Sequence, residues 1–324
     1  MTKVVNMQPN ESVAAKDFGK VAVLMGGWSA EREVSLSSGK AVLQALLEKG
    51  VDAHPIDVQK GTVIEKITQG KFDRAFNILH GPGGEDGVIQ GVFEVLDIPL
   101  TGSGVMSSSI AMDKLRSKQL LEGAGIPTPA YLKLEEDTDA GYVEAMLGLP
   151  VMIKPAMEGS SIGMTRVNET EELAAAYQLA AQYQSSVLAE RWIEGDEYTV
   201  AILADEALPV IKLETPHEFY DYEAKYQSND THYICPCGLS ATEEQQLQRL
   251  ALSAYYALGA SGWGRVDIMC DHEGTPWVIE LNTLPGMTDH SLVPIAAKAA
   301  GISFDDLVIK ILEQTMVTKA GEKQ

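Results

Sequence analysis

Short apolar runs alternate with amphipathic segments in the first third of the chain. Residues 21–25 and 75–79 are almost entirely apolar and each ends at a turn, a pattern typical of buried strands. The segment that stops at Gly50 and residues 89–96 carry apolar side chains at helical spacing. The order strand, helix, strand, helix predicts a parallel sheet wrapped by helices.

A second region begins after the glycine-containing segment 101–104. We expect one helix to carry residues 112–115, and we expect Pro127 and Pro129 to mark a break in the chain. Beyond this break the order of elements favours an α+β arrangement. It consists of strands at 151–153, 164–167 and 186–193 and an alanine-rich helix from Glu171.

The last third has further strands at 198–203 and 208–213, followed by a long stretch, 215–239, without periodicity. Irregular segments of this length inside compact domains are usually lids or binding loops. A helix is predicted to begin after Ser240, because Glu243 follows three residues later and completes a capping box.

Two strand-like runs around the turn 273–274 predict a β-hairpin near the C-terminal end. Such a turn pairs Asp267 with Glu280 and Arg265 with Asn282. Because side chains alternate along a strand, these four polar groups would share one face. The opposite face, toward the core, would carry Val266, Ile268, Cys270, Trp277, Ile279 and Leu281.

Carboxylate and carboxamide oxygens on a rigid hairpin suit a hard cation, and Mg²⁺ usually completes its shell with substrate phosphates and water. A guanidinium beside them suits a carboxylate or a transferring phosphoryl group. The general alternative is a solvated polar face. The turn-rich segment 283–288 favours a site, because its backbone amides would lie close to the same patch.

Candidate phosphate-binding groups precede the hairpin. Loop 158–163 follows a strand that ends in Lys154, so its N–H groups could cover phosphates while the lysine supplies charge. The loop is not a Walker motif, and a plain surface loop fits it equally well. Lys114 and Lys225 are further candidate cations, with solvated surface lysines as the alternative.

Two loops follow the predicted parallel strands, where open α/β sheets bind ligands. They are residues 26–31 and residues 80–87, and the second could place the His80 imidazole over the same cleft. A histidine that caps a turn is the alternative. The G-x-G-x-x-G motif is absent from the first loop and incomplete at 102–107, which disfavours a nicotinamide dehydrogenase.

Composition narrows the class of protein. A formal net charge of −21 excludes nucleic-acid binding driven by a basic surface. No apolar run approaches the ~20 residues of a membrane span, and the first twenty residues lack the apolar stretch of a signal peptide. The three cysteines form neither a disulfide framework nor a four-ligand zinc pattern. We therefore expect a cytoplasmic protein.

Taken together, these segments resemble the D-alanine:D-alanine ligases of the ATP-grasp superfamily, from about Lys20 to about Leu312. The resemblance rests on Gly-Gly-Trp-Ser-Ala-Glu-Arg-Glu-Val-Ser from Gly26, the loop 80–87, Thr-Gly-Ser-Gly at 101–104, Met-Asp-Lys at 112–114, Lys-Pro at 154–155 with Glu-Gly-Ser-Ser at 158–161, Tyr-Asp-Tyr-Glu-Ala-Lys-Tyr at 220–226, Gly-Trp-Gly-Arg-Val-Asp at 262–267, and Glu-Leu-Asn-Thr-Leu-Pro-Gly-Met-Thr at 280–288.

The resemblance implies a three-domain ATP-grasp architecture, α/β and α+β, with an N-terminal parallel-sheet domain. Its expected parts are a flexible extension, 1–17, an N-terminal substrate domain, 18–102, a central ATP-grasp domain, 103–189, and a C-terminal ATP-grasp domain, 190–324, with a lid at 215–239 and a metal-binding hairpin at 263–282.

The resemblance also assigns ligands. Asp267, Glu280 and Asn282 would hold Mg²⁺ or Mn²⁺, with two ions expected and a monovalent cation as a further candidate. Lysines would contact the phosphates of ATP, and residues around the adenine and ribose would complete its site. The ATP-binding set is Lys114, Lys154, Glu190, Arg191, Trp192, Ile193, Glu197, Phe219 and Lys225.

In the family reaction, ATP phosphorylates the carboxylate of one D-alanine, and the amine of a second D-alanine displaces the phosphate. By resemblance, Glu31 and His80 would bind the first substrate, and Ser291 and the Leu292 amide would bind the second. Arg265 and the Gly286 N–H would stabilise the oxyanion. Glu31, Ser160 and Tyr226 match a hydrogen-bonded trio that positions the loops.

The expected enzyme is therefore a cytoplasmic homodimer that makes D-alanyl-D-alanine for peptidoglycan, with neither nucleic-acid binding nor membrane insertion. One alternative is a ligase with another second substrate, such as D-lactate, which the pair Lys225 and Tyr226 disfavours. A nucleotide-binding regulator without catalysis is the other alternative, disfavoured because the hairpin residues and all three lysines remain.

Overall fold

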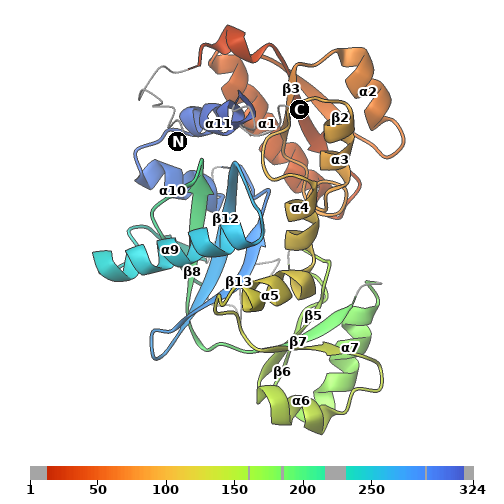
Figure 1. The fold of residues 1–324 in the computed structure, drawn as a ribbon, viewed down its shortest axis with the longest axis vertical. Coiled ribbons are helices and arrows are strands. Elements are labelled where there is room, and N and C mark those ends of the chain that lie inside the picture. The colour runs from red at the N-terminus through yellow and green to blue at the C-terminus, as the bar shows by residue number, and fades with distance from the viewer. Residues whose placement is uncertain (1–12, 160, 184–185, 216–230, 289, 317–324) are drawn as a thin grey trace, which may run out of the picture.

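The computed structural model describes residues 13–159, 161–183, 186–215, 231–288 and 290–316. Within these ranges the chain forms three sheets (Figure 1). The N-terminal and C-terminal sheets lie near each other, and the central sheet lies apart at the far end of the long axis (Figure 1).

The N-terminal sheet is parallel, as the sequence predicted. Its strand order is β2-β1-β3, and β2 is a strand that the sequence prediction did not include. Its strands and helices are β1 (Lys20–Gly26), α1 (Arg32–Glu48), β2 (Asp52–Val58), α2 (Val63–Gly70), β3 (Arg74–Asn77) and α3 (Val88–Val95). Because β1 and β3 end side by side, the loops that follow them emerge at the same edge of the sheet.

Part of the N-terminal segment expected to be a loose extension is structured. Residues 1–12 lie outside the described ranges, but Ala15–Phe18 form a 3₁₀ helix, η1. The Phe18 side chain is fully buried and belongs to the hydrophobic core that contains Val21 and Val23 of β1. Sequence reasoning missed this element because one aromatic residue carries it, without any periodicity.

The single helix expected around residue 113 is two helices. They are α4 (Val105–Met112) and α5 (Lys114–Gly123). Asp113 between them has an extended backbone, and its carboxylate accepts a hydrogen bond from the Arg116 N–H, which caps α5. The cap makes Lys114 the first residue of α5.

The central sheet is antiparallel, with order β4-β7-β5-β6, and it packs on α6 and α7. Its elements are β4 (Tyr131–Leu134), α6 (Ala140–Leu147), β5 (Val151–Pro155), β6 (Thr165–Val167), η2 (Thr170–Glu172), α7 (Leu173–Ala181) and β7 (Val187–Arg191). The sequence prediction placed β5, β6 and β7 within a few residues of their observed positions, but it did not include β4.

The C-terminal sheet is also antiparallel, with order β11-β10-β8-β12-β13 and a short β9 beside β8. Its elements are β8 (Gly195–Leu203), β9 (Glu206–Ala207), β10 (Ile211–Glu214), β11 (His232–Ile234), α9 (Ala241–Ala257), β12 (Trp263–Asp271), β13 (Pro276–Asn282), α10 (Leu292–Ala299), α11 (Phe304–Glu313) and η3 (Gln314–Met316). Ser240 and Glu243 form the predicted capping box of α9. Strand β11 falls inside the segment expected to be irregular.

One hydrophobic core joins the N-terminal and C-terminal sheets. It contains Val21 and Phe76 from the first sheet, Leu203 and Trp263 from the last, and Ile311 from α11. In Figure 1, α11 accordingly lies beside α1. The central sheet has a separate core with α6 and α7. Among the described helices, none is both long and apolar enough to cross a membrane.

Candidate active site

Two cavities lie next to each other between the three sheets. The first, of about 540 Å³, is lined by the loops after β1 and β3 and by the segment that follows β13. The second, of about 500 Å³, lies between the central and C-terminal sheets. Lys114 and Glu280 line both cavities, and the Lys114 Nζ lies 3.7 Å from the Glu280 Oε2. This pair therefore marks the junction of the two spaces.

The hairpin β12–β13 pairs the residues that the sequence predicted. Arg265 lies opposite Asn282, and Asp267 lies opposite Glu280. The turn, however, is centred on Glu273, since the Asp271 N–H donates to the Thr275 carbonyl. A bulge next to Asp267 adds one residue to β13 and restores the pairing at the site.

Because of the bulge, side chains of β13 face other directions than the sequence predicted. Trp277 and Ile279 were expected to face the core, but Val278 and Leu281 are the buried residues of this strand. Ile279 lines the second cavity instead, next to Glu280. The Trp277 Nε1 donates to the Asp271 Oδ2 at 3.0 Å, close to the turn. The prediction from strict alternation was wrong because the extra residue changes the face of the strand on which each side chain lies.

The Asp267 carboxylate is held by four hydrogen bonds. Arg265 donates two of them, both at 2.8 Å, while Asn282 and Thr199 donate at 3.0 Å and 2.6 Å. Two opposed carboxylates and a carboxamide provide the oxygen ligands that Mg²⁺ or Mn²⁺ prefers, so the residues fit a divalent cation. Among the described residues no group of three or more His, Cys, Asp and Glu could hold a metal, and the predicted ligand set is instead two carboxylates with the Asn282 amide.

Lys114 extends from the start of α5 to the loop that follows β5. Its Nζ donates to the Glu158 carbonyl at 2.6 Å, and its backbone N–H donates to the Ala156 carbonyl at 2.9 Å. Burial raises the pKa of the Glu158 carboxyl, and the nearby Lys114 partly opposes that rise. The helix start and the Glu158 loop are thus held together at the junction of the cavities.

Glu190 of β7 forms buried ion pairs with Lys154 and with Lys118. Burial alone would raise the pKa of Glu190, but the two ammonium groups hold it below its usual value. Glu190 and Lys154 line the second cavity. Sequence reasoning missed Lys118, although its spacing of four residues from Lys114 on one helix face was a signal that could have found it.

The remaining predicted nucleotide residues lie around the second cavity. Arg191, Trp192, Ile193 and Glu197 all line it. The Arg166 guanidinium lies over the Trp192 ring, 4.7 Å from its centroid, which is a cation–π contact. An aromatic ring, an aliphatic side chain and a carboxylate on one wall suit a nucleoside.

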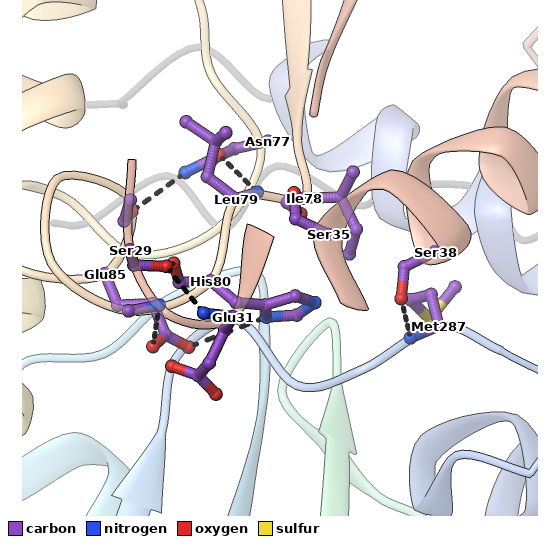
Figure 2. Close-up of polar contacts among 12 residues, drawn as sticks. Ser29, Glu31, Ser35, Ser38, Asn77, Ile78, Leu79, His80, Glu85 and Met287 are labelled. Carbon is purple, nitrogen blue, oxygen red and sulfur yellow. Dashed lines mark hydrogen bonds and ion pairs between the residues drawn. The ribbon is translucent and has the colours of Figure 1, made fainter. Parts of the chain in front are cut away.

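The loops after β1 and β3 bring Glu31 and His80 into the first cavity. Figure 2 shows both side chains with Glu85 where these loops meet. The Ser29 hydroxyl donates to the His80 carbonyl at 2.6 Å, and the Gly81 N–H donates to Glu85 at 2.8 Å, which fixes the second loop. The buried His80 Nε2 has no hydrogen-bond partner among the described residues. It is available to a ligand.

The other side of the first cavity is formed by Gly286, Ser291 and Leu292. The Ser291 hydroxyl accepts a hydrogen bond from the Thr288 N–H at 3.0 Å, and Leu292 begins α10. A Cβ atom at residue 286 would lie 2.8 Å from the Ser291 Oγ, so a side chain there would displace the Ser291 hydroxyl. The Met287 N–H donates to Ser38 of α1, which fixes this segment against the N-terminal domain (Figure 2).

Four of the predicted site residues lie outside the described ranges. They are Ser160, Phe219, Lys225 and Tyr226, and most of the expected lid at 215–239 lies there too. The structure therefore brings together, around two joined cavities, the predicted residues from the N-terminal loops, the central sheet, the hairpin and the segment after it.

Comparisons with known proteins agree with this architecture. The family model described as D-ala D-ala ligase N-terminus matches residues 20–68 and 62–103. The model described as D-ala D-ala ligase C-terminus matches residues 120–313. Proteins named D-alanine--D-alanine ligase from Nitrosococcus oceani and Methylococcus capsulatus are 59% and 56% identical to the chain, covering 94% and 92% of it and 96% of each relative.

Solved structures give the same result. A D-alanine--D-alanine ligase from Bacillus anthracis complexed with ATP has a TM-score of 0.80 and 35% identity, over 92% of this chain and 97% of that chain. The VanG D-Ala:D-Ser ligase from Enterococcus faecalis has a TM-score of 0.79 and 33% identity, over 91% and 99%. The predicted ATP-grasp fold class is confirmed. With family models and relatives that span nearly its whole length, the chain belongs to the D-alanine:D-alanine ligase family.

Proposed function

We propose that this enzyme joins two D-alanines to D-alanyl-D-alanine, with ATP converted to ADP and phosphate through a D-alanyl phosphate intermediate. The observation that carries the proposal is the contact of two cavities at Lys114 and Glu280. One cavity suits a nucleotide and the other a small amino acid, so a phosphoryl group can pass from one to the other at this junction.

The first step transfers the γ-phosphoryl group of ATP to a carboxylate oxygen of the first D-alanine. Lys114 and Lys154 supply positive charge to the phosphates at the junction, and Glu31 and His80 bind the amino acid from the other side. Asp267, Glu280 and Asn282 would hold Mg²⁺ or Mn²⁺, with two ions expected. A divalent ion bound there would neutralise the charge that develops on the transferring phosphoryl group.

The second step joins the two amino acids. The amine of the second D-alanine attacks the carbonyl carbon of the acyl phosphate, forms the C–N bond, loses a proton and expels phosphate. The Arg265 guanidinium and the Gly286 N–H stabilise the oxyanion of the tetrahedral intermediate. Ser291 and the Leu292 amide, at the start of α10, hold the carboxylate of the second substrate.

The lid is assigned to 215–239, with Phe219 near the adenine and Lys225 on a phosphate. Closing it would keep water away from the acyl phosphate. Glu31, Ser160 and Tyr226 form the trio that positions the loops. We further propose that the enzyme is a homodimer and that it acts in the cytoplasm. The three free cysteines of the chain are compatible with a reducing compartment.

The proposal is tested by phosphate release with ATP, Mg²⁺ and D-alanine, run beside L-alanine and beside D-alanine with D-lactate. We expect release with D-alanine alone, matched mole for mole by a dipeptide that mass spectrometry identifies. A depsipeptide formed in preference to the dipeptide would favour the ligase with another second substrate. Nucleotide binding without turnover on any of them would favour the silent regulator.

A further inference from the structure

Lys118 is a fully buried lysine that the proposed reaction does not use. It lies on α5, one turn after Lys114, and is 1% exposed. Among the described residues that line the two cavities, Lys114, Lys154 and Glu190 all line the second cavity, whereas Lys118 lines neither. Its ammonium group lies behind the wall of the nucleotide cavity, where it cannot contact a nucleotide directly.

The buried cluster around Lys118 has more positive than negative groups. Glu190 forms ion pairs with both Lys118 and Lys154, so two ammonium groups share one carboxylate. The cluster therefore carries one net positive charge, and its only members on the cavity wall are Lys154 and Glu190. Burying an ammonium group is costly unless it is paired and hydrogen-bonded, and Lys118 has both an ion pair with Glu190 and a hydrogen bond to the Thr128 hydroxyl.

Removing Lys118 would change the charge of the cavity wall. Glu190 and Lys154 would then form a neutral ion pair, and Lys154 would offer almost no net charge to an anionic ligand. With Lys118 present, Glu190 can hold the Lys154 side chain in place without cancelling its charge. The carboxylate fixes position, and the second ammonium group restores the charge.

The location of Lys118 links the two sheets that enclose the nucleotide cavity. Its Nζ donates to the Thr128 hydroxyl at 2.8 Å, and that hydroxyl donates to the Val278 carbonyl of β13 at 2.8 Å. Val278 lies two residues before Glu280 on the same strand. Lys118 thus connects β7 of the central sheet with the strand that carries a proposed metal ligand.

We propose that Lys118 is a positioning residue for ATP: it neutralises Glu190, so that Glu190 orients Lys154 while Lys154 keeps a net positive charge for the polyphosphate. The inference deepens the proposed function and rests on it, because it requires that the second cavity binds ATP through Lys154. Lys118 acts through Glu190 and touches no substrate.

The experiment compares Lys118→Met, Lys118→Arg and the double variant Lys118→Met/Glu190→Gln. Titration calorimetry measures affinity for Mg²⁺-ATP and for adenosine, which shares the base and ribose but has no phosphates. Steady-state kinetics gives KM for ATP and kcat, and thermal unfolding reports stability. Lys133→Met serves as the matched control, because it removes one exposed charge from the central sheet, which also carries Glu190 and Lys154.

We expect Lys118→Met to weaken ATP affinity by roughly tenfold and to raise KM for ATP in parallel, with adenosine affinity within about twofold of the wild type. Lys118→Arg should retain most of the ATP affinity. The double variant should bind ATP better than Lys118→Met, because Lys154 no longer has a carboxylate that cancels its charge. Lys133→Met should leave both affinities unchanged.

Equal losses of ATP and adenosine affinity in Lys118→Met, or no recovery in the double variant, would overturn the proposal and leave Lys118 a purely structural residue. If Lys118→Met does not fold, the double variant is the remaining test. Both of its substituted side chains are neutral, and a loss of ATP affinity tenfold or more beyond any loss of adenosine affinity would count against the proposal. Failure of the proposed function is distinguishable, because the wild type would then show no D-alanine-dependent turnover, whereas failure of this inference leaves the turnover of the wild type intact.

Discussion

At the scale of single residues, the two carboxylates of the hairpin are held differently. Asp267 accepts four hydrogen bonds from three side chains, so its orientation is set before a substrate arrives. Glu280, directly opposite, lies at the junction of the cavities and 3.7 Å from Lys114. Of the two, Glu280 is better placed to respond to a ligand.

Replacing Glu280 with glutamine should therefore impair activity much more than stability. The amide keeps the shape of the side chain but weakens a proposed metal ligand, so we expect kcat to fall by about 100-fold or more. The midpoint of thermal unfolding should change by no more than about 3 °C, because no core cavity is opened. Glu273→Gln, an exposed position in the same hairpin, is the matched control. Activity near that of the wild type would reject Glu280 as a ligand.

A pH dependence of ATP affinity follows from the buried cluster. Burial lowers the pKa of Lys118 to about 8, while Glu190 acts in the opposite direction and Lys154, Glu280 and the Tyr131 ring also face the cluster. Above pH 8 the neutral amine no longer balances Glu190, so ATP affinity should fall as pH rises from 7 to 9.5.

Calorimetry at several pH values measures this effect, with adenosine as the ligand whose affinity should stay level. In Lys118→Arg the ATP affinity should not fall between pH 7 and 9.5, because a guanidinium stays protonated. An ATP profile that is identical in the wild type and in Lys118→Arg would show that another group titrates.

At the scale of elements, the break between α4 and α5 decides where Lys114 points. The Asp113 cap starts a new helix, so Lys114 stands at a helix N-terminus beside the Glu158 loop rather than within a continuous helix. The sequence predicted a helix here but not the break, because Asp113 follows an uninterrupted helical pattern and acts through its own backbone conformation.

The Asp113 cap should therefore affect nucleotide binding as well as stability. We expect Asp113→Ala to cost about 1 kcal/mol in the free energy of unfolding, measured by urea denaturation, and to raise KM for ATP several-fold. Ser240→Ala removes a comparable cap from α9, away from the cavities, and should cost similar stability with KM for ATP unchanged. Equal effects of both variants on KM would contradict a local role for the break.

At the scale of the whole molecule, the N-terminal and C-terminal sheets form one body through a shared core, and the central sheet has a core of its own. The N-terminal and C-terminal parts of the chain therefore pack together, while the segment between them in sequence forms a separate core. The final helix, α11, packs against α1, and Lys49 of the loop after α1 forms an ion pair with Asp306 at 2.7 Å.

Two core substitutions should show that the shared core and the core of the central sheet are independent. Ile311→Ala should cost about 2–5 kcal/mol and raise hydrogen exchange in both the N-terminal and C-terminal sheets. Leu147→Ala, in the core of the central sheet, should cost a similar amount and raise exchange mainly there. Hydrogen exchange followed by mass spectrometry measures both. Exchange that rises only near residue 311 in the first variant would contradict a shared core.

The amount that the sequence could predict varies with the range of the interaction. Hydrophobic periodicity predicted the parallel sheet, and the alternation of polar residues predicted the pairing of Asp267 with Glu280. Lys154 and Glu190 were predicted individually as nucleotide-binding residues, but their contact with Lys118 was not, because the three residues are far apart in sequence and meet only when α5 packs on the central sheet. The shared core was equally hidden, since no local pattern tells which sheet a helix will cover.

The bulge in β13 has a consequence for how this hairpin can vary among relatives. A turn longer by one residue and no bulge would bring Asp267 and Glu280 opposite each other just as the present turn and bulge do. With a bulge available, the length of the turn can change without changing which residues pair at the site. Insertions and deletions at the tip can be absorbed halfway down the hairpin, so loop length can drift while the two carboxylates stay aligned.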